Sequence, residues 1–124
     1  MSQPELSDLP ILLVEDDPLV LEATAELLAD GGCSVRRAST ADEALAALDD
    51  GPIPAVLVTD ISLASDRSGL DLARTVAERW PQVKLLIVSG AHRPPREDYP
   101  EGALFFTKPY AGGALLRMVK GDDW

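Results

Sequence analysis

The sequence predicts an α/β fold in which a five-stranded parallel sheet carries helices on both faces. Short apolar runs alternate with amphipathic stretches along the chain, and three of these runs are nearly continuous in Val, Leu, Ile and Ala. Such runs are typical of strands that are covered on both faces. No linker rich in Gly, Ser or Pro and no internal repeat divides the 124 residues. We therefore expect one domain over residues 1–124, with residues 1–8 flexible.

The apolar runs and the signals between them place the individual elements. The expected strands are Leu9–Val14, Ser34–Ala38, Ala55–Asp60, Val83–Ser89 and Ala103–Thr107. The expected helix starts are Asp17-Pro18, the capping box Thr40–Glu43 and the similar pattern Ser68–Asp71, and a last helix is expected from about Tyr110 to Lys120. The expected helix ends are Gly31-Gly32, Gly51-Pro52 and Trp80-Pro81.

The segment Ala91–Gly102 departs from this pattern. It contains Pro94, Pro95 and Pro100, and proline inside a helix removes a backbone hydrogen bond and clashes with the preceding turn. We therefore expect a reduced or irregular fourth helix.

Composition excludes several classes of function. The formal net charge is −10, from 11 basic and 21 acidic residues, which argues against nucleic acid and anionic membrane as partners. No apolar run near the N-terminus is long enough to span a bilayer or to resemble a signal peptide, so a cytoplasmic location is expected. The single cysteine, Cys33, excludes an intrachain disulfide and is expected to be buried.

Polar side chains follow four of the expected strands. Glu15 and Asp16 follow the first, Asp60 ends the third, Ser89 ends the fourth, and Lys108 follows the fifth. In a parallel α/β sheet, ligands bind beyond the carboxyl ends of the strands, so these side chains are expected to converge. Each has a simpler structural explanation as a helix cap, a turn residue or a surface charge, and we assign Asp17 mainly to capping. Their occurrence together, in this order, favours a common site.

Three crowded carboxylates facing one ammonium are costly. Two like charges about 4 Å apart repel by about 4 kcal/mol at an effective dielectric near 20. Either a carboxyl pKa rises or a cation binds. Carboxylate oxygens with room for water suit Mg²⁺, and a lysine and a hydroxyl suit phosphoryl oxygens. The pattern indicates phosphoryl transfer at a nucleophilic carboxylate.

At these residues the chain resembles the receiver domains of two-component response regulators over essentially its whole length. The motifs are Ile11–Pro18, Val58–Leu63, Ile87–Gly90 and Phe105–Pro109, in the family's order. The resemblance implies a flavodoxin-like strand order of 2-1-3-4-5. It also implies that Asp60 is the phosphoacceptor and that Mg²⁺ is the cofactor.

The resemblance assigns a role to each remaining site residue. Asp16, Glu15, Asp60 and the backbone carbonyl of Ser62 would hold Mg²⁺. Lys108 and Ser89 would bind the phosphoryl group, and Ser89 with Phe105 would form the switch, the ring moving into space that Ser89 vacates. The implied phosphodonor is a histidine kinase or a phosphotransfer protein of a phosphorelay. An unknown downstream protein would bind according to the phosphorylation state of this chain. The chain itself is expected to be a monomer or a weak dimer.

Two departures from the family pattern affect loops. The loop from Asp60 to Gly69 is one residue longer than usual and has Ala64 where Pro is common, and the stretch between Ser89 and Lys108 is shorter. We expect no output domain after Trp124, and therefore a phosphorylation-switched signalling module without its own output domain.

Other functions remain open at this point. A degenerate receiver would bind protein independently of phosphate, and the chain could instead be a segment cut from a hybrid sensor kinase. A Mg²⁺-dependent phosphatase with an aspartyl nucleophile would usually carry a second Asp two residues later, where this chain has Ser62. We therefore expect no conventional enzyme, but a protein that catalyses its own phosphorylation and dephosphorylation.

Overall fold

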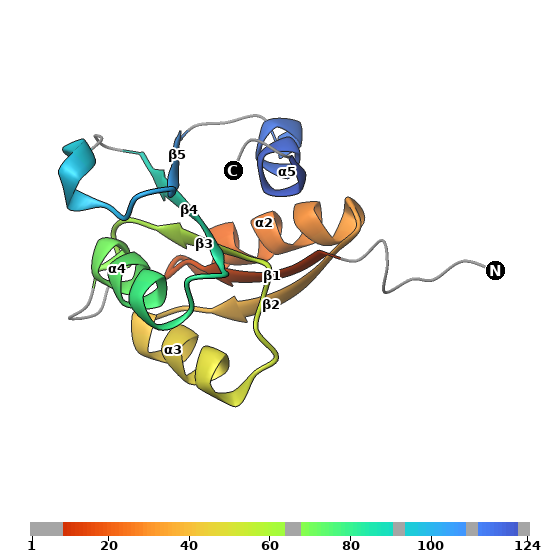
Figure 1. Cartoon of the computed structure of the whole chain (residues 1–124). Helices are drawn as coiled ribbons and strands as arrows, with labels where there is room; N and C mark the ends of the chain where they lie inside the picture. Colours follow the sequence, from red (N-terminus) through yellow and green to blue (C-terminus); the bar gives the residue numbers. More distant parts are fainter. Residues whose placement is uncertain (1–8, 64–67, 91–93, 109–111, 122–124) are drawn as a thin grey trace.

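Five parallel strands form one sheet in the order β2-β1-β3-β4-β5, as predicted (Figure 1). The computed structural model describes residues 9–63, 68–90, 94–108 and 112–121. The strands are β1 (Leu9–Val14), β2 (Cys33–Ala38), β3 (Val56–Asp60), β4 (Lys84–Ser89) and β5 (Leu104–Thr107). The helices are α2 (Pro18–Asp30), α3 (Ala41–Asp50), α4 (Gly69–Arg79) and α5 (Gly112–Lys120), with a single 3-10 turn, η1 (Arg96–Asp98).

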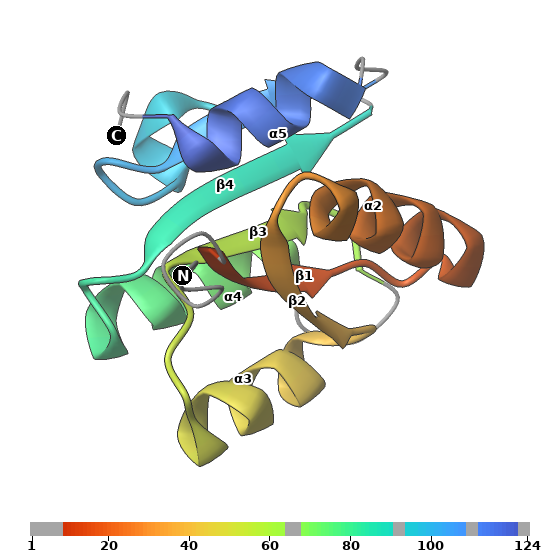
Figure 2. The ribbon, with the colours of Figure 1, turned by 90° about the vertical axis from the view of Figure 1, so that its right-hand side faces the viewer.

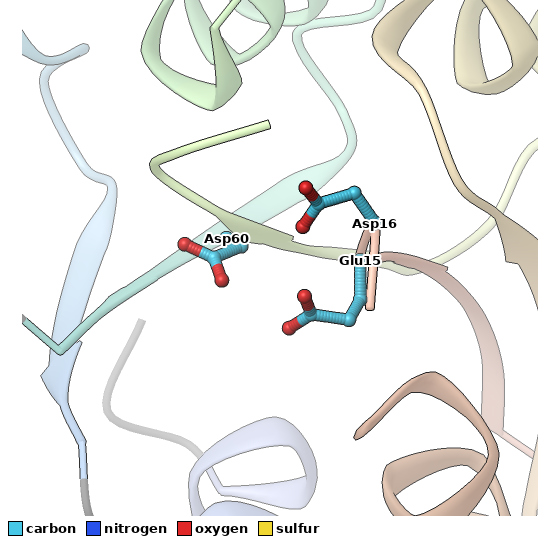
Figure 3. A group of neighbouring side chains, drawn as sticks. All are labelled: Glu15, Asp16 and Asp60. Carbon is cyan, nitrogen blue, oxygen red and sulfur yellow. The ribbon is translucent and has the colours of Figure 1, made fainter. Parts of the chain in front are cut away.

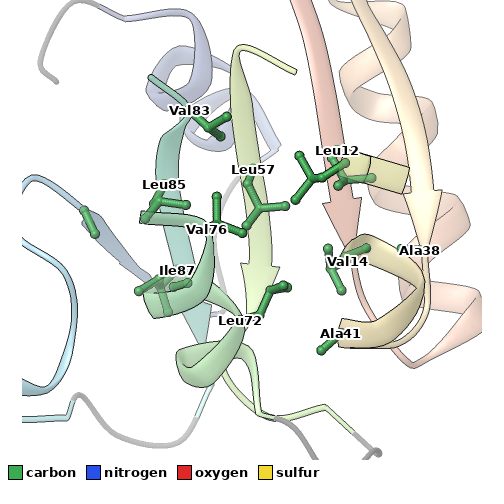
Figure 4. Close-up of a cluster of buried hydrophobic side chains, with 14 of the residues drawn as sticks. Leu12, Val14, Ala38, Ala41, Leu57, Leu72, Val76, Val83, Leu85 and Ile87 are labelled. Carbon is green, nitrogen blue, oxygen red and sulfur yellow. The ribbon is translucent and has the colours of Figure 1, made fainter. Parts of the chain in front are cut away.

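Helices cover both faces of the sheet, so the strands are buried between two apolar layers. α2 and α5 lie on one face and α3 and α4 on the other (Figures 1 and 2). The core beneath α3 and α4 includes Leu12 and Leu57 from the sheet and Leu72 and Val76 from α4 (Figure 4). The core on the opposite face joins Leu28 of α2 and other residues of α2 and α5 to the alternate side chains of the same strands. This double burial accounts for the nearly continuous apolar runs in the sequence.

Strand register places the carboxyl ends of four strands at one edge of the sheet. Val14 lies opposite Thr59, Asp60 lies opposite Val88, and Ser89 lies opposite Thr107. The residues that end or follow β1, β3, β4 and β5 are therefore neighbours, although they are far apart in the sequence.

Side-chain caps begin three helices where the sequence predicts them. The Asp17 carboxylate accepts hydrogen bonds from the backbone N–H groups of Leu19 and Val20 at the start of α2. Ser68 and Asp71 form a reciprocal capping box at the start of α4. At α3 the predicted box is different in detail. Thr40 accepts from the Glu43 amide, but the Glu43 carboxylate reaches back to the amide and hydroxyl of Ser39 rather than to the amide of Thr40.

Four strands begin one residue away from their predicted starts. β2 gains Cys33, which is buried as expected and lies opposite Leu9. β4 and β5 each begin one residue later, because the amides of Val83 and Ala103 donate to the carbonyl oxygens of Trp80 and Pro100 in the preceding turns. β3 likewise begins one residue late.

The segment between β4 and β5 contains no full helix within its described residues, as the prolines predict. It contains η1, and residues 91–93 lie outside the described chain. The predicted start of the last helix near Tyr110 and the expected flexibility of residues 1–8 also concern residues outside the described chain. In the described ranges, every helix is too short or too polar to cross a membrane.

Candidate functional site

Three carboxylates converge at the carboxyl edge of the sheet, as the sequence predicts. Glu15 and Asp16 directly follow β1, and Asp60 is the last residue of β3. One oxygen from each carboxylate lies within 4.8 Å of an oxygen from the other two (Figure 3). Glu15 is buried, whereas Asp16 and Asp60 are half-buried.

Lys108 supplies the ammonium expected at this site. Its Nζ atom donates to Oδ2 of Asp60 at 2.9 Å and to Oε1 of Glu15 at 3.3 Å. Its position follows from the sheet, since the Lys108 amide donates to the carbonyl oxygen of Ser89 just beyond the β4–β5 ladder. Within the described part of the site, one ammonium therefore lies between two of three carboxylates.

Electrostatics at Glu15 are unfavourable for the ionised form. Burial raises the pKa of Glu15 above its ordinary value of 4.5, and the charge of Asp60 raises it further. The hydrogen bond from the Asp17 amide and the charge of Lys108 lower the pKa of Glu15, but by less than burial and Asp60 raise it. For Lys108, burial acts to lower the pKa, but the hydrogen bonds and charges of Asp60 and Glu15 together raise it above 10.5. Lys108 is thus firmly protonated, and a single ammonium leaves the carboxylates with excess negative charge.

Asp60 is held by its neighbours on several sides. Its Oδ1 atom accepts a hydrogen bond from the amide of Ser62 at 3.0 Å, and its backbone carbonyl accepts one from the buried hydroxyl of Thr59 at 2.9 Å. A Cβ atom at Gly69 would collide with the same carbonyl oxygen, so α4 begins in direct contact with the backbone of Asp60. The amide of Gly69 donates to the carbonyl of Ile61. The Ser62 amide thus holds the carboxylate of Asp60, and Thr59 and the start of α4 contact its backbone carbonyl.

Thr59 and Gly69 are site residues that the sequence analysis missed. A polar residue inside a buried strand, one position before the key carboxylate, was a visible signal for Thr59. Gly69 lies within the recognised capping pattern Ser68–Asp71, but its close approach to Asp60 depends on the loop that joins them. A helix-start glycine by itself gives no sign of such a contact.

Ser89 and Phe105 occupy neighbouring strands beside this cluster. Ser89 is the last residue of β4, and 2% of its surface is exposed. Phe105 of β5 lies opposite Ile87 of β4. Because side chains alternate along a strand, Ser89, Ile87 and Phe105 share one face of the sheet, the face that α4 covers. Phe105 packs against the α4-side core. Ser62 is exposed, and its carbonyl group as a metal ligand stays a prediction.

The donor set fits a small hard cation. Three carboxylates with oxygens within 4.8 Å of one another, one of them destabilised in its ionised form, offer the oxygen ligands and the negative charge that a cation such as Mg²⁺ binds. A groove lined by Lys84, Glu101 and neighbouring residues lies at the opposite end of β4 and does not contact this site.

The fold and the site together define a class: a doubly wound parallel α/β domain with an acidic, lysine-bridged site at the carboxyl ends of its strands. The chain matches the family model of the response regulator receiver domain over residues 11–120 and belongs to that family.

Individual relatives agree with this assignment. The crystal structure of a CheY-like receiver domain protein from Methanospirillum hungatei covers 92% of both chains with a TM-score of 0.83 and 29% identity. The response regulator protein TmoT of Ectopseudomonas mendocina is 33% identical over 114 residues, which are 89% of this chain and 50% of TmoT. The sensor protein TorS of Escherichia coli is 33% identical over 81 residues, which are 65% of this chain and 9% of TorS. The chain thus spans at most half the length of these two curated relatives.

Proposed function

We propose that this receiver domain accepts a phosphoryl group on Asp60 and thereby switches between two signalling states. The observation that carries the proposal is the geometry around Asp60. The carboxylate is half-buried, held by the Ser62 amide, paired with Lys108 at 2.9 Å and placed within 4.8 Å of two further carboxylates. Such an arrangement favours a reaction in which negative charge accumulates on the oxygens of a transferred phosphoryl group.

The proposed donor is a phosphohistidine on a histidine kinase or a phosphotransfer protein. A carboxylate oxygen of Asp60 attacks phosphorus, the P–N bond breaks, and its electron pair leaves with the imidazole, which then takes a proton from water. The product is an acyl phosphate on Asp60. Lys108, already within hydrogen-bond distance of Asp60, neutralises charge on a phosphoryl oxygen, and Ser89 donates its hydroxyl to another.

Glu15, Asp16, Asp60 and the carbonyl of Ser62 are the proposed ligands of Mg²⁺. When bound, the metal neutralises the excess charge of the carboxylates and of the phosphoryl oxygens. Without the metal, Lys108 reduces the repulsion between the carboxylates of Glu15 and Asp60, because its ammonium group donates to both.

Two alternatives predict different behaviour. A phosphatase with an aspartyl nucleophile would need an acid/base group near Asp60, and the residue two positions later is the exposed Ser62. A phosphate-independent binding module would have the same fold but would not accept a phosphoryl group on Asp60. The similarity to part of the sensor protein TorS keeps the hybrid-kinase origin open. A cytoplasmic location and a monomer or weak dimer stay predictions.

Intact-mass spectrometry after incubation with acetyl phosphate and Mg²⁺ tests the proposal. We expect one added phosphoryl group on the wild-type chain, and none when Mg²⁺ is chelated. Asp60→Asn, which keeps the shape of the side chain and removes the nucleophile, should stay unmodified. If the wild type stays unmodified with acetyl phosphate and with candidate phosphodonor proteins, the binding-module alternative replaces this one. A phosphoryl group that persists in Asp60→Asn would assign the acceptor elsewhere.

A further inference from the structure

A small cavity lies between the sheet and α2, beside the proposed phosphoryl site. Its lining combines apolar residues of the sheet with four polar side chains, and the described lining residues are Leu13, Val14, Glu15, Thr24, Val58, Asp60, Val88 and Lys108. Glu15 points to this side of the sheet and Asp16 to the other (Figure 3). Three of the four polar residues already belong to the proposed site. The fourth, Thr24 of α2, has no role in the proposed function.

Thr24 places a hydroxyl group on the face of α2 that packs against the sheet. It is half-buried, and its neighbours on this face, Ala25 and Leu28, are buried apolar residues. A threonine inside a helix often donates its hydroxyl to the carbonyl four residues earlier. Thr75 of α4 does this, because its hydroxyl donates to the carbonyl of Asp71 at 3.1 Å. Within the described part of the chain, the Thr24 hydroxyl makes no such bond, and its side chain lines the cavity.

Lys108 has one more hydrogen-bond donor than its protein partners use in the described part of the site. Of its three N–H groups, one donates to Asp60 at 2.9 Å and one to Glu15 at 3.3 Å. The cavity that Lys108 lines has a volume of about 10 Å³, close to the least that holds one water molecule. A buried water needs about two to four polar partners, and Lys108, Glu15 and Thr24 can supply three.

We propose that Thr24 binds one water molecule in this cavity, and that this water holds the Lys108 ammonium in position for the phosphoryl group. The water accepts a hydrogen bond from Lys108, donates one to the Glu15 carboxylate and shares one with the Thr24 hydroxyl. Thr24 is a positioning residue, because it acts through the water and Lys108. An ammonium group that is already ordered costs less to align with the transferred phosphoryl oxygens. The consequence for phosphorylation rests on the proposed function, whereas the water site does not.

A crystal structure and NMR of the unphosphorylated protein test the water site first, without any phosphoryl chemistry. We expect one ordered water within hydrogen-bond distance of the Thr24 hydroxyl and of Nζ of Lys108. It should persist in Thr24→Ser and be absent in Thr24→Val, which keeps the shape of the side chain and removes the hydroxyl. The ammonium protons of Lys108 should exchange with solvent about fivefold faster in Thr24→Val, the effect of losing one hydrogen bond. A wild-type crystal structure without this water, or an unchanged exchange rate in Thr24→Val, overturns the proposal.

A second arm measures the rate of phosphorylation by acetyl phosphate at saturating Mg²⁺. We expect Thr24→Val to react about fivefold more slowly than the wild type and Thr24→Ser to restore the wild-type rate, since only the hydroxyl is needed. Thr75→Val is the matched control, because it makes the same change in α4, on the opposite face of the sheet, and should react like the wild type.

The outcomes of the second arm separate this proposal from the proposed function. Equal rates for Thr24→Val and the wild type overturn the positioning role of Thr24. Equal losses in Thr24→Val and Thr75→Val also overturn it, because they would show a general effect of valine in a helix. A wild type that takes no phosphoryl group counts instead against the proposed function, and the first arm then decides the water site alone.

Discussion

Gly69 shows at the scale of a single residue how the backbone of α4 is fitted to Asp60. A methyl group at this position would collide with the Asp60 carbonyl oxygen. We expect Gly69→Ala to lower the free energy of unfolding by about 1–3 kcal/mol, because either β3 or α4 must shift.

Gly113→Ala is the matched control. Its methyl group would meet the Arg117 guanidinium at an ordinary 3.5 Å, so it should raise the free energy by about 0.5–1 kcal/mol. Urea denaturation measures both, and equal effects would contradict the close fit.

A substitution at Asp16 tests whether repulsion between the carboxylates of the metal-free site lowers the stability of the protein. Its carboxylate lies within 4.8 Å of those of Glu15 and Asp60. We expect Asp16→Asn to raise the free energy of unfolding by about 1 kcal/mol when divalent cations are chelated, since one repelling charge is removed. The wild type should gain about 1.4 kcal/mol at Mg²⁺ tenfold above its dissociation constant, and the variant should lose most of this gain.

Asp17→Asn is the control for Asp16→Asn, because it also removes a charge from this loop but keeps a good helix cap. Thermal or urea unfolding with and without Mg²⁺ distinguishes the two. A variant Asp16→Asn that responds to Mg²⁺ like the wild type would remove this residue from the proposed metal site.

At the scale of the element, the start of α4 links helix capping to the site. Ser68 accepts a hydrogen bond from the Asp71 amide, and the next residue contacts Asp60. We expect Ser68→Ala to lower the free energy of unfolding by about 1 kcal/mol and to weaken Mg²⁺ binding, since α4 supports the Asp60 backbone. Thr40→Ala removes the equivalent cap of α3 at a similar cost, but Mg²⁺ affinity should not change. Isothermal titration with Mg²⁺ is the measurement, and equal losses of affinity would show that the effect is general destabilisation.

The elements themselves were largely predictable, because their signals are local. Apolar runs and caps placed β1 and the starts of α2, α3 and α4, since burial on both faces and the satisfaction of helix-end amides act over a few residues. The starts of β4 and β5 were displaced because the amides of Val83 and Ala103 are used in turns. Proline content correctly predicted that the described residues between β4 and β5 form no full helix, but it could not show that the ring of Tyr99 would lie 5.8 Å from that of Phe105.

At the scale of the whole molecule, the convergence of Glu15, Asp16, Asp60 and Lys108 followed from topology alone. Once the strands are parallel, the carboxyl ends of β1, β3 and β5 lie at one edge of the sheet, independently of the shape of the connecting loops. The contacts of Thr59 and Gly69 with the Asp60 backbone could not be predicted in the same way. They depend on the shape of the chain between β3 and α4, which no periodic pattern encodes.

The raised pKa of Glu15 makes the stability of the whole domain depend on pH. Burial is the main cause of the raised value. Because the folded pKa exceeds the unfolded one, the contribution of Glu15 to stability is fully present below pH 4.5 and is lost as the pH rises through the folded pKa. In a chelating buffer, we expect the free energy of unfolding of the wild type to fall relative to that of Glu15→Gln over this range. Denaturation series at several pH values measure this difference, and a constant difference would contradict a raised pKa.

The ion pair between Lys108 and Glu15 joins residues that are 93 positions apart in the sequence. On an emerging polypeptide, the three acidic side chains would therefore exist long before their counter-charge has been synthesised. They acquire it only when β5 has docked against β4 and has brought Lys108 to the end of β1. Contacts of such long range form late, because the loop that they close is costly in entropy. Under the proposed function, phosphorylation of Asp60 thus requires a completely assembled sheet, and a partly folded chain would not be phosphorylated.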